Sequence, residues 1–247
     1  MKMKKLKLCA VLTMLSAVFF TTACNDAAST KEESAEKTTT TKVDTVAKPT
    51  ETTPAAFVPF KVMSVTHTVK DYAAFKIVYD AKDSMRQANG LTKLAVCRDD
   101  ANPNKVYVFL KAADIQKAKD FAASPALKEA MKKAGVNSVP AFLYVDVVRF
   151  GETPLQKGRV RIGHKVKDYD TWLKVYDAEG KATREANGLI DRSLSRDISD
   201  PNYVYVTFAI SDLAKAKARL ADPALKKLMT EAGVIGVPVI DFYTSVE

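Results

Sequence analysis

The sequence predicts an α+β fold built from two tandem βαββαβ repeats within one chain. The first observation behind this prediction is a duplicated motif. The segment His67–Tyr72 (HTVKDY) returns 97 positions later as His164–Tyr169 (HKVKDY). The second is that strand-like and helix-like patterns follow in the same order in both copies. Two copies of one small unit imply a pseudo-dimer in a single chain, so any site in one copy has a candidate counterpart in the other.

The duplication extends through nearly the whole of both copies, at an offset of 98 after one inserted residue. The further matches are 89–91 with 187–189 (Asn-Gly-Leu), 98–99 with 196–197 (Arg-Asp), 103–104 with 201–202 (Pro-Asn), 125–128 with 223–226 (Pro-Ala-Leu-Lys), 134–136 with 232–234 (Ala-Gly-Val) and 139–140 with 237–238 (Val-Pro). Residues 58–149 and 159–247 are therefore expected to form the two repeats, with 150–158 as the linker.

Residues 1–23 have the features of a bacterial lipoprotein signal peptide. Four lysines, at positions 2, 4, 5 and 7, precede an apolar stretch, Leu8–Phe20, that is too short to span a membrane. The small residues before Cys24 resemble a lipobox, although Thr21 stands where Leu is usual. The resemblance implies acylation of Cys24, with a lipid bilayer as partner and the cell envelope as location. An ordinary secretory signal with an incidental cysteine is the alternative.

Composition limits the function of the remaining chain. Loss of the four signal lysines lowers the formal charge from +9 to +5, and acidic residues alternate with basic ones along the predicted helices. This pattern predicts solvated faces and no nucleic-acid surface. Residues 24–57 are rich in Thr, Lys, Ser and Glu, which predicts a disordered tether. Cys97, the one cysteine beyond Cys24, cannot form an internal disulfide and is expected as a small buried strand residue.

The first half of each repeat is predicted from periodicity and capping. In repeat 1 the alternation of Met63–His67 indicates a strand. Asp71 then offers an N-cap to a helix in which Tyr72 and Phe75 begin an apolar stripe, and Asn89-Gly90 ends that helix. The corresponding features of repeat 2 are Val160–His164, Asp168, Tyr169, Trp172 and Asn187-Gly188.

The second half of each repeat begins with a hairpin. In repeat 1, turn residues separate Lys93–Arg98 from Val106–Leu110, and a helical region near Asp114 restarts at Ser124-Pro125 before a last strand, Pro140–Val148. The counterparts are Asp191–Arg196, Val204–Phe208, Asp212, Asp222-Pro223 and Pro238–Tyr243. This order is the ferredoxin-like split βαβ arrangement, in which helices cover one face of the sheet. Consecutive large apolar residues in the last strands predict that the other repeat covers the second face.

The repeated motifs resemble those of one superfamily. The pattern His-x-Val-Lys-Asp-Tyr-x-x-Trp at 164–172 is followed by Gly-Leu, Arg-Asp, Asp-Pro-Asn, Pro-Ala-Leu-Lys and Ala-Gly-Val-x-x-Val-Pro. It is similar to the dimeric α/β-barrel superfamily, and most similar to small antibiotic-biosynthesis-monooxygenase-like proteins. The resemblance implies that the tandem repeats form, within one chain, the barrel usually formed by two. It does not fix an activity, because the superfamily includes cofactor-free monooxygenases, haem-degrading enzymes, lactone isomerases and members without known activity.

Two histidines are the candidate catalytic residues. His67 and His164 occupy equivalent positions at the end of the first strands, on the same face as Val65 and Ile162. Neutral imidazole could act as an acid or a base near pH 7. The alternative is a structural histidine inherited twice by duplication. No Cys, His or carboxylate set with metal-ligand spacing surrounds them, so neither a metal nor another cofactor is expected.

Two further residue pairs are candidates for ligand binding. Arg98 and Arg196 lie at strand ends, where each could bind an anionic group or tie down its hairpin with the adjacent Asp. Tyr107 and Tyr205 lie in mid-strand, where each could line a pocket or pack in the core.

Phe75 and Trp172 are equivalent positions on the helical apolar stripe, and core packing is the alternative to a role in binding. The superfamily resemblance implies a ligand cleft between helices and sheet. By that inference the cleft collects His67, Phe75 and Tyr107 in repeat 1, and His164, Trp172 and Tyr205 in repeat 2.

These observations lead to one expectation and two alternatives for function. We expect a lipid-anchored envelope protein whose tandem barrel binds a small apolar or aromatic molecule. The alternatives are a cofactor-independent monooxygenase or isomerase that uses His67 or His164, and a structural envelope protein without a ligand. A sealed interior would exclude binding and catalysis, whereas a histidine and an arginine converging on an open cavity would favour the enzyme.

Overall fold

The computed structural model describes residues 57–151 and 154–246, which fall within one compact unit, Thr53–Glu247. The predicted signal peptide, the anchor at Cys24 and nearly all of the predicted tether lie outside the described residues. Within the described part of the chain, no helix combines the length and apolar character needed to cross a membrane.

Both repeats contain four strands and four short helices. In repeat 1 these are β1 (Phe60–Thr68), α1 (Tyr72–Asp80), α2 (Asp83–Ala88), β2 (Leu91–Asp99), β3 (Lys105–Ala112), α3 (Ile115–Ala123), α4 (Pro125–Lys133) and β4 (Ala141–Phe150). In repeat 2 they are β5 (Gly158–Val166), α5 (Tyr169–Glu179), α6 (Lys181–Ala186), β6 (Leu189–Asp197), β7 (Tyr203–Ile210), α7 (Leu213–Ala221), α8 (Pro223–Glu231) and β8 (Val234–Ser245). The predicted tandem βαββαβ order is confirmed.

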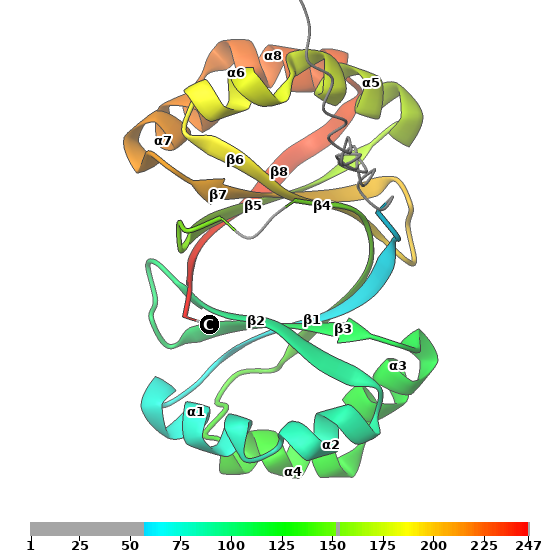
Figure 1. The fold of residues 1–247 in the computed structure, drawn as a ribbon, viewed down its shortest axis with the longest axis vertical. Coiled ribbons are helices and arrows are strands. Elements are labelled where there is room, and N and C mark those ends of the chain that lie inside the picture. Colours follow the sequence, from blue (N-terminus) through cyan, green and yellow to red (C-terminus); the bar gives the residue numbers. More distant parts are fainter. Residues whose placement is uncertain (1–56, 152–153, 247) are drawn as a thin grey trace, which may run out of the picture. The chain divides into compact units, whose positions relative to one another are not determined.

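The eight strands form one closed antiparallel barrel in the order β1-β3-β2-β8-β5-β7-β6-β4. Each repeat contributes four neighbouring strands, and β2–β8 and β4–β6 are the pairs that join the repeats. The helices of the two repeats lie on opposite outer sides of the barrel, as Figure 1 shows. The two edge strands of each repeat pair with the edge strands of the other. In the described barrel, no strand therefore has a wholly unpaired edge.

Side-chain capping begins the helices where the sequence predicts it. Asp71 and Asp168 accept hydrogen bonds from the backbone N–H groups of Ala74 and Thr171. Ser124 and Asp222 cap α4 and α8, each of which starts with proline.

The structure differs from the sequence prediction in the first helical region, which is two helices in each repeat. In repeat 1 the guanidinium of Arg86 donates to the carbonyl oxygen of Tyr79, at the end of α1, over 2.7 Å. In repeat 2 Arg184 makes the equivalent bond to Tyr176, and Gly180, with φ +80°, separates α5 from α6. In both repeats a buried arginine of the second helix thus donates to a carbonyl near the C-terminal end of the first helix.

Strand alternation separates two environments. Residues in phase with Val65 and Ile162 face the helices and form two apolar cores, one for each repeat. Residues in the opposite phase face the barrel interior, where polar and charged side chains lie beside a smaller apolar cluster around Val62, Val145 and Val147. Each repeat therefore has its own core, and the interior is shared.

Candidate functional site

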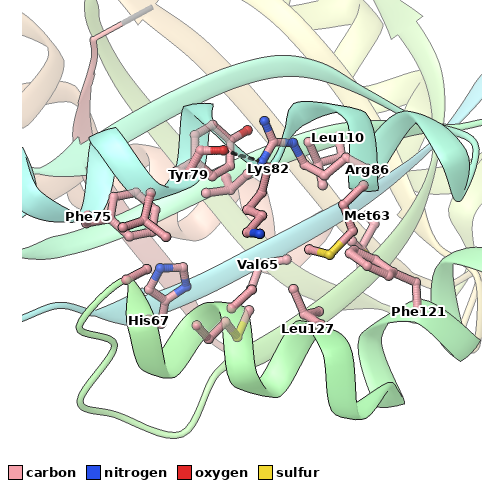
Figure 2. Close-up of a pocket in the computed structure, with 16 residues that line it drawn as sticks. Met63, Val65, His67, Phe75, Tyr79, Lys82, Arg86, Leu110, Phe121 and Leu127 are labelled. Carbon is pink, nitrogen blue, oxygen red and sulfur yellow. Dashed lines mark hydrogen bonds between the residues drawn. The ribbon is translucent and has the colours of Figure 1, made fainter.

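One cleft lies between the helices and the sheet of each repeat. The cleft of repeat 1 encloses about 60 Å³ and that of repeat 2 about 80 Å³. Their walls are mainly apolar and come from equivalent elements, namely β1, β3 and α1–α4 in repeat 1 and β5–β7 and α5–α8 in repeat 2. Figure 2 shows the cleft of repeat 1, with His67 at one end and Phe121 and Leu127 towards the other.

His67 and His164 are buried polar residues that line these clefts. Each is only 4% exposed. Among the described residues, neither ring nitrogen of either histidine has a hydrogen-bond partner. Burial lowers the pKa of both imidazoles to about 4, so both are neutral at pH 7. Each imidazole therefore offers one unused N–H donor and one unused nitrogen acceptor to its cleft.

Aromatic rings form the wall beside each histidine. In repeat 1 the ring centroids of His67 and Phe75 are 5.3 Å apart, and Phe75 stacks on Tyr79 at 5.6 Å. In repeat 2 the corresponding distances are 5.5 Å from His164 to Trp172, and 5.3 Å from Trp172 to Tyr176. The structure thus places the histidine of each repeat beside the aromatic residue that was expected to share its cleft.

The two clefts differ in charge. Lys82 lines the cleft of repeat 1, and Figure 2 shows its side chain reaching over the cleft from the α1–α2 connection. In repeat 2, Glu179 lines the cleft and pairs with Arg219 at 2.8 Å. Phe121 occupies the position in repeat 1 that is equivalent to Arg219. An anionic ligand group would thus be attracted by Lys82 in one cleft, whereas the charges lining the other are already paired.

Arg86 and Arg184 line the clefts and were missed by the sequence predictions. The guanidinium of Arg86 lies 3.8 Å from the ring centroid of Tyr79, and that of Arg184 lies 4.2 Å from Tyr176. Both are buried and donate to the carbonyl oxygens of these same tyrosines, in the last turn of α1 and of α5. Both arginines stand three residues before an Asn-Gly pair, and this repetition in the sequence could have marked them as equivalent residues with a shared role. Each arginine thus lines the same cleft as the histidine of its repeat, although its guanidinium is held by contacts within the protein.

Arg98 and Arg196 line neither cleft. The Nε atom of Arg98 donates to the carbonyl oxygen of Pro103 over 2.7 Å, and that of Arg196 donates to Pro201 over 2.8 Å. Each guanidinium also covers the tyrosine that begins the first helix of its repeat. This matches the alternative in which they tie down the hairpins, although the acceptor is a loop carbonyl and not the adjacent Asp.

Tyr107 and Tyr205 face the barrel interior, so the expectation that they share a cleft with the histidines is wrong. The hydroxyl of Tyr107 lies 2.9 Å from a carboxylate oxygen of Asp99 and 3.2 Å from one of Asp241. Burial, followed by the charge of Asp241, raises the pKa of Tyr107. The alternation Val106-Tyr107-Val108 already placed this ring on the opposite face from the apolar residues that contact the helices.

Cys97 is buried in the barrel interior, as predicted for a small strand residue. Burial raises the pKa of its thiol to about 12, so the thiol is protonated and a poor nucleophile at pH 7. Among the described residues, no group of three or more His, Cys, Asp or Glu side chains could hold a metal ion.

Fold and clefts together define a tandem form of the dimeric α/β barrel made of ferredoxin-like units. Among solved structures, the chain is similar to a putative monooxygenase from Fusobacterium nucleatum, with a TM-score of 0.52, 13% identity, and coverage of 77% of this chain and 93% of that one. It is also similar to an anthrone oxidase-like protein, with a TM-score of 0.53, 12% identity and coverage of 76% and 92%. A putative chlorite dismutase has a TM-score of 0.50, 15% identity and coverage of 76% and 95%.

No protein-family model and no curated protein sequence matches this chain. At such identities the structural similarity establishes the fold and not the activity.

Proposed function

We propose that this protein binds a small apolar or aromatic molecule in the clefts between helices and sheet, with His67 or His164 bonding to one polar atom of the ligand. The observation that carries the proposal is the pair of buried, neutral imidazoles without hydrogen-bond partners among the described residues. A buried polar group without a partner costs on the order of 1–3 kcal/mol. A ligand with one polar group and an apolar body offsets that cost and fits the lining.

Binding at these clefts requires them to widen. An apolar cavity of about 150 Å³ holds benzene, whereas the clefts enclose only about 60 and 80 Å³. The outer walls include α4 and α8, neither of which has a buried residue. Moving α4 or α8 outward therefore exposes less apolar surface than moving a helix or strand that has buried apolar residues.

The histidine pKa favours binding over acid–base catalysis. A general base is most effective when its pKa is near the working pH, and burial holds both imidazoles at about 4. A cofactor-independent monooxygenase or isomerase is the second candidate. The observation favouring it is the fold shared with a putative monooxygenase and an anthrone oxidase-like protein. A structural envelope protein without a ligand is the third.

We further propose that acylated Cys24 anchors the protein to a bilayer of the bacterial envelope. The support comes from the sequence, in which a lysine-rich start and a short apolar stretch precede small residues and Cys24. A polar segment of about 30 residues would then separate the barrel from the membrane, over roughly 30 Å.

Native mass spectrometry of the full-length chain, purified without denaturation and then exposed to a library of small aromatic compounds, tests the binding proposal. We expect ligands of one chemical class, either retained through purification or bound from the library. We expect the double variant His67→Leu/His164→Leu to lose this binding. Arg98→Met is the matched control, because Arg98 lines neither cleft. A parent chain that binds no compound, or a double variant that binds as well as the parent, contradicts the proposal.

A further inference from the structure

A cavity of about 240 Å³ lies inside the barrel, on the opposite side of the sheet from the clefts. Strands of both repeats line it. Leu94 and Phe109 come from repeat 1, and Arg159, Arg192 and Thr207 come from repeat 2. It is three to four times larger than either cleft, and none of its lining residues belongs to them.

Arg159 is the unusual residue of this cavity. It is 8% exposed, and its Nη1 atom donates to the backbone carbonyl oxygens of Gln156 and Gly158. Among the described residues no carboxylate pairs with it. A buried charge without a counter-ion is destabilising by several kcal/mol, and burial also lowers the pKa of this guanidinium. The remaining donors of Arg159 are thus available to an anion in the cavity.

The neighbouring carboxylates of the barrel interior do not neutralise Arg159, because they already pair with other cations. Arg161 pairs with Asp241 at 2.8 Å. Lys105 lies 3.2 Å from Asp99 and 3.7 Å from Asp241. Two cations and two carboxylates thus form one network next to the cavity, and Arg159 is not part of it.

Arg192 adds a second positive charge to the wall. Its guanidinium lies 3.7 Å from the ring centroid of Phe150 and donates to the carbonyl oxygen of Gly151. These contacts hold the group in place at the cavity wall. Burial, together with the charge of Arg159, lowers the pKa of Arg192. The positive charge of Arg159 thus acts on Arg192, which lies on the same wall of the cavity.

The duplication shows that this polar character is specific to repeat 2. The positions of repeat 1 equivalent to Arg159, Tyr243 and Ser245 are Val62, Val145 and Val147. These three valines form an apolar cluster with aromatic neighbours. One side of the interior is therefore packed with apolar side chains, whereas the other presents a cation and hydroxyl groups to a cavity.

We propose that the barrel interior is a second binding site, for a small aromatic carboxylate. Its carboxylate pairs with the guanidinium of Arg159, and its ring packs against Leu94 and Phe109. Planar guanidinium matches carboxylate in a two-bond geometry. The volume exceeds the roughly 150 Å³ that suffices for benzene. Leu94, which is 37% exposed, lies at the rim and gives the ligand an apolar entrance.

Isothermal titration calorimetry of the full-length chain with benzoate, in a low-chloride buffer at pH 7, tests this proposal. We expect one benzoate for each chain, with a dissociation constant at least about tenfold lower than that of benzyl alcohol, which lacks the charge. Arg159→Met should weaken benzoate binding by at least about tenfold. Thr207→Phe, which introduces the residue found at the equivalent position of repeat 1, should weaken it by filling the cavity.

Two controls separate this site from the clefts. Arg98→Met removes an arginine from outside the barrel, and His67→Leu/His164→Leu alters only the clefts, so both should leave benzoate binding unchanged. Arg159→Met should unfold at the same or a higher temperature, because it removes an uncompensated buried charge. No binding by the parent, equal binding by Arg159→Met and Thr207→Phe, or equal affinity for benzyl alcohol or inorganic phosphate overturns the proposal.

Discussion

The imidazole of His164 lies edge-on to the indole of Trp172, with 5.5 Å between ring centroids, and the imidazole of His67 holds the same position beside Phe75 at 5.3 Å. The duplicated chain thus contains the same buried arrangement twice. The aromatic partner differs, which provides a spectroscopic label in repeat 2 alone.

Stability should fall with acidity below pH 6.5. The pKa of His67 and of His164 is about 4 in the folded protein and 6.5 in the unfolded chain. Between these values the unfolded chain binds more protons, so the free energy of unfolding decreases as the pH falls from 6.5 to 4. Each histidine contributes up to about 3 kcal/mol to this decrease. Urea denaturation across this range measures it.

The double variant His67→Leu/His164→Leu serves as the reference for that titration. Carboxylates of the unfolded chain bind protons mainly below about pH 5, so we expect the free energy of unfolding of this variant to be nearly constant between pH 6.5 and 5, where the parent already loses stability. A slope as steep as that of the parent would show that other groups cause the dependence.

Trp172 should report ligand binding to the cleft of repeat 2. It is the one tryptophan in the chain and is 4% exposed in the wall of that cleft. We expect an aromatic ligand of the cleft to change its fluorescence, and His164→Leu to weaken that titration by about tenfold through loss of one hydrogen bond. His67→Leu, in the other repeat, is the matched control and should leave the titration unchanged. Identical effects of the two variants would contradict separate clefts.

Gly188→Ala should destabilise the protein more than Gly90→Ala, although the two glycines are equivalent in the repeats. Both have a positive φ, +77° and +70°, which costs an alanine about 1 kcal/mol. A Cβ atom at Gly188 would lie 2.5 Å from the carbonyl oxygen of Asp212, whereas at Gly90 the nearest atom is the Cβ of Ala113 at 3.5 Å. The clash should add about 1–3 kcal/mol at Gly188. Chemical denaturation of both variants measures the difference, and equal losses would contradict it.

Cys24→Ala should release the protein from the membrane fraction, because it removes the proposed acylation site. Fractionation of expressing cells, with immunodetection of the chain in membrane and soluble fractions, measures the effect. Cys97→Ala is the control, since Cys97 is buried in the barrel. Unchanged membrane association of Cys24→Ala would contradict lipid anchoring.

Much of the fold follows from the sequence because its signals are local and occur twice. Asp71, Asp168 and the Pro-initiated helices are placed by capping rules that involve only neighbouring residues. The split of the first helix was not predicted, because the apolar stripe continues through it and the bonds of Arg86 and Arg184 to carbonyls of the first helix are not visible in that periodicity.

In the candidate site, too, contacts within one repeat could be predicted from local patterns, whereas contacts between the repeats could not. Strand alternation and helical spacing place His67 beside Phe75 and His164 beside Trp172, since all four face the space between one sheet and its own helices. By contrast, Tyr107 is brought to Asp241, 134 positions away, by closure of the barrel. No local pattern encodes such a contact.

The sequence by itself determined the repeat, the order of its elements and the identity of the two buried histidines, because each depends on short-range periodicity or on direct comparison of the copies. The tertiary structure alone decided what lies inside the barrel. The pairing of β2 with β8 and of β4 with β6 brings together residues from both repeats. Only that closure leaves Arg159 buried beside a cavity, with no carboxylate partner among the described residues.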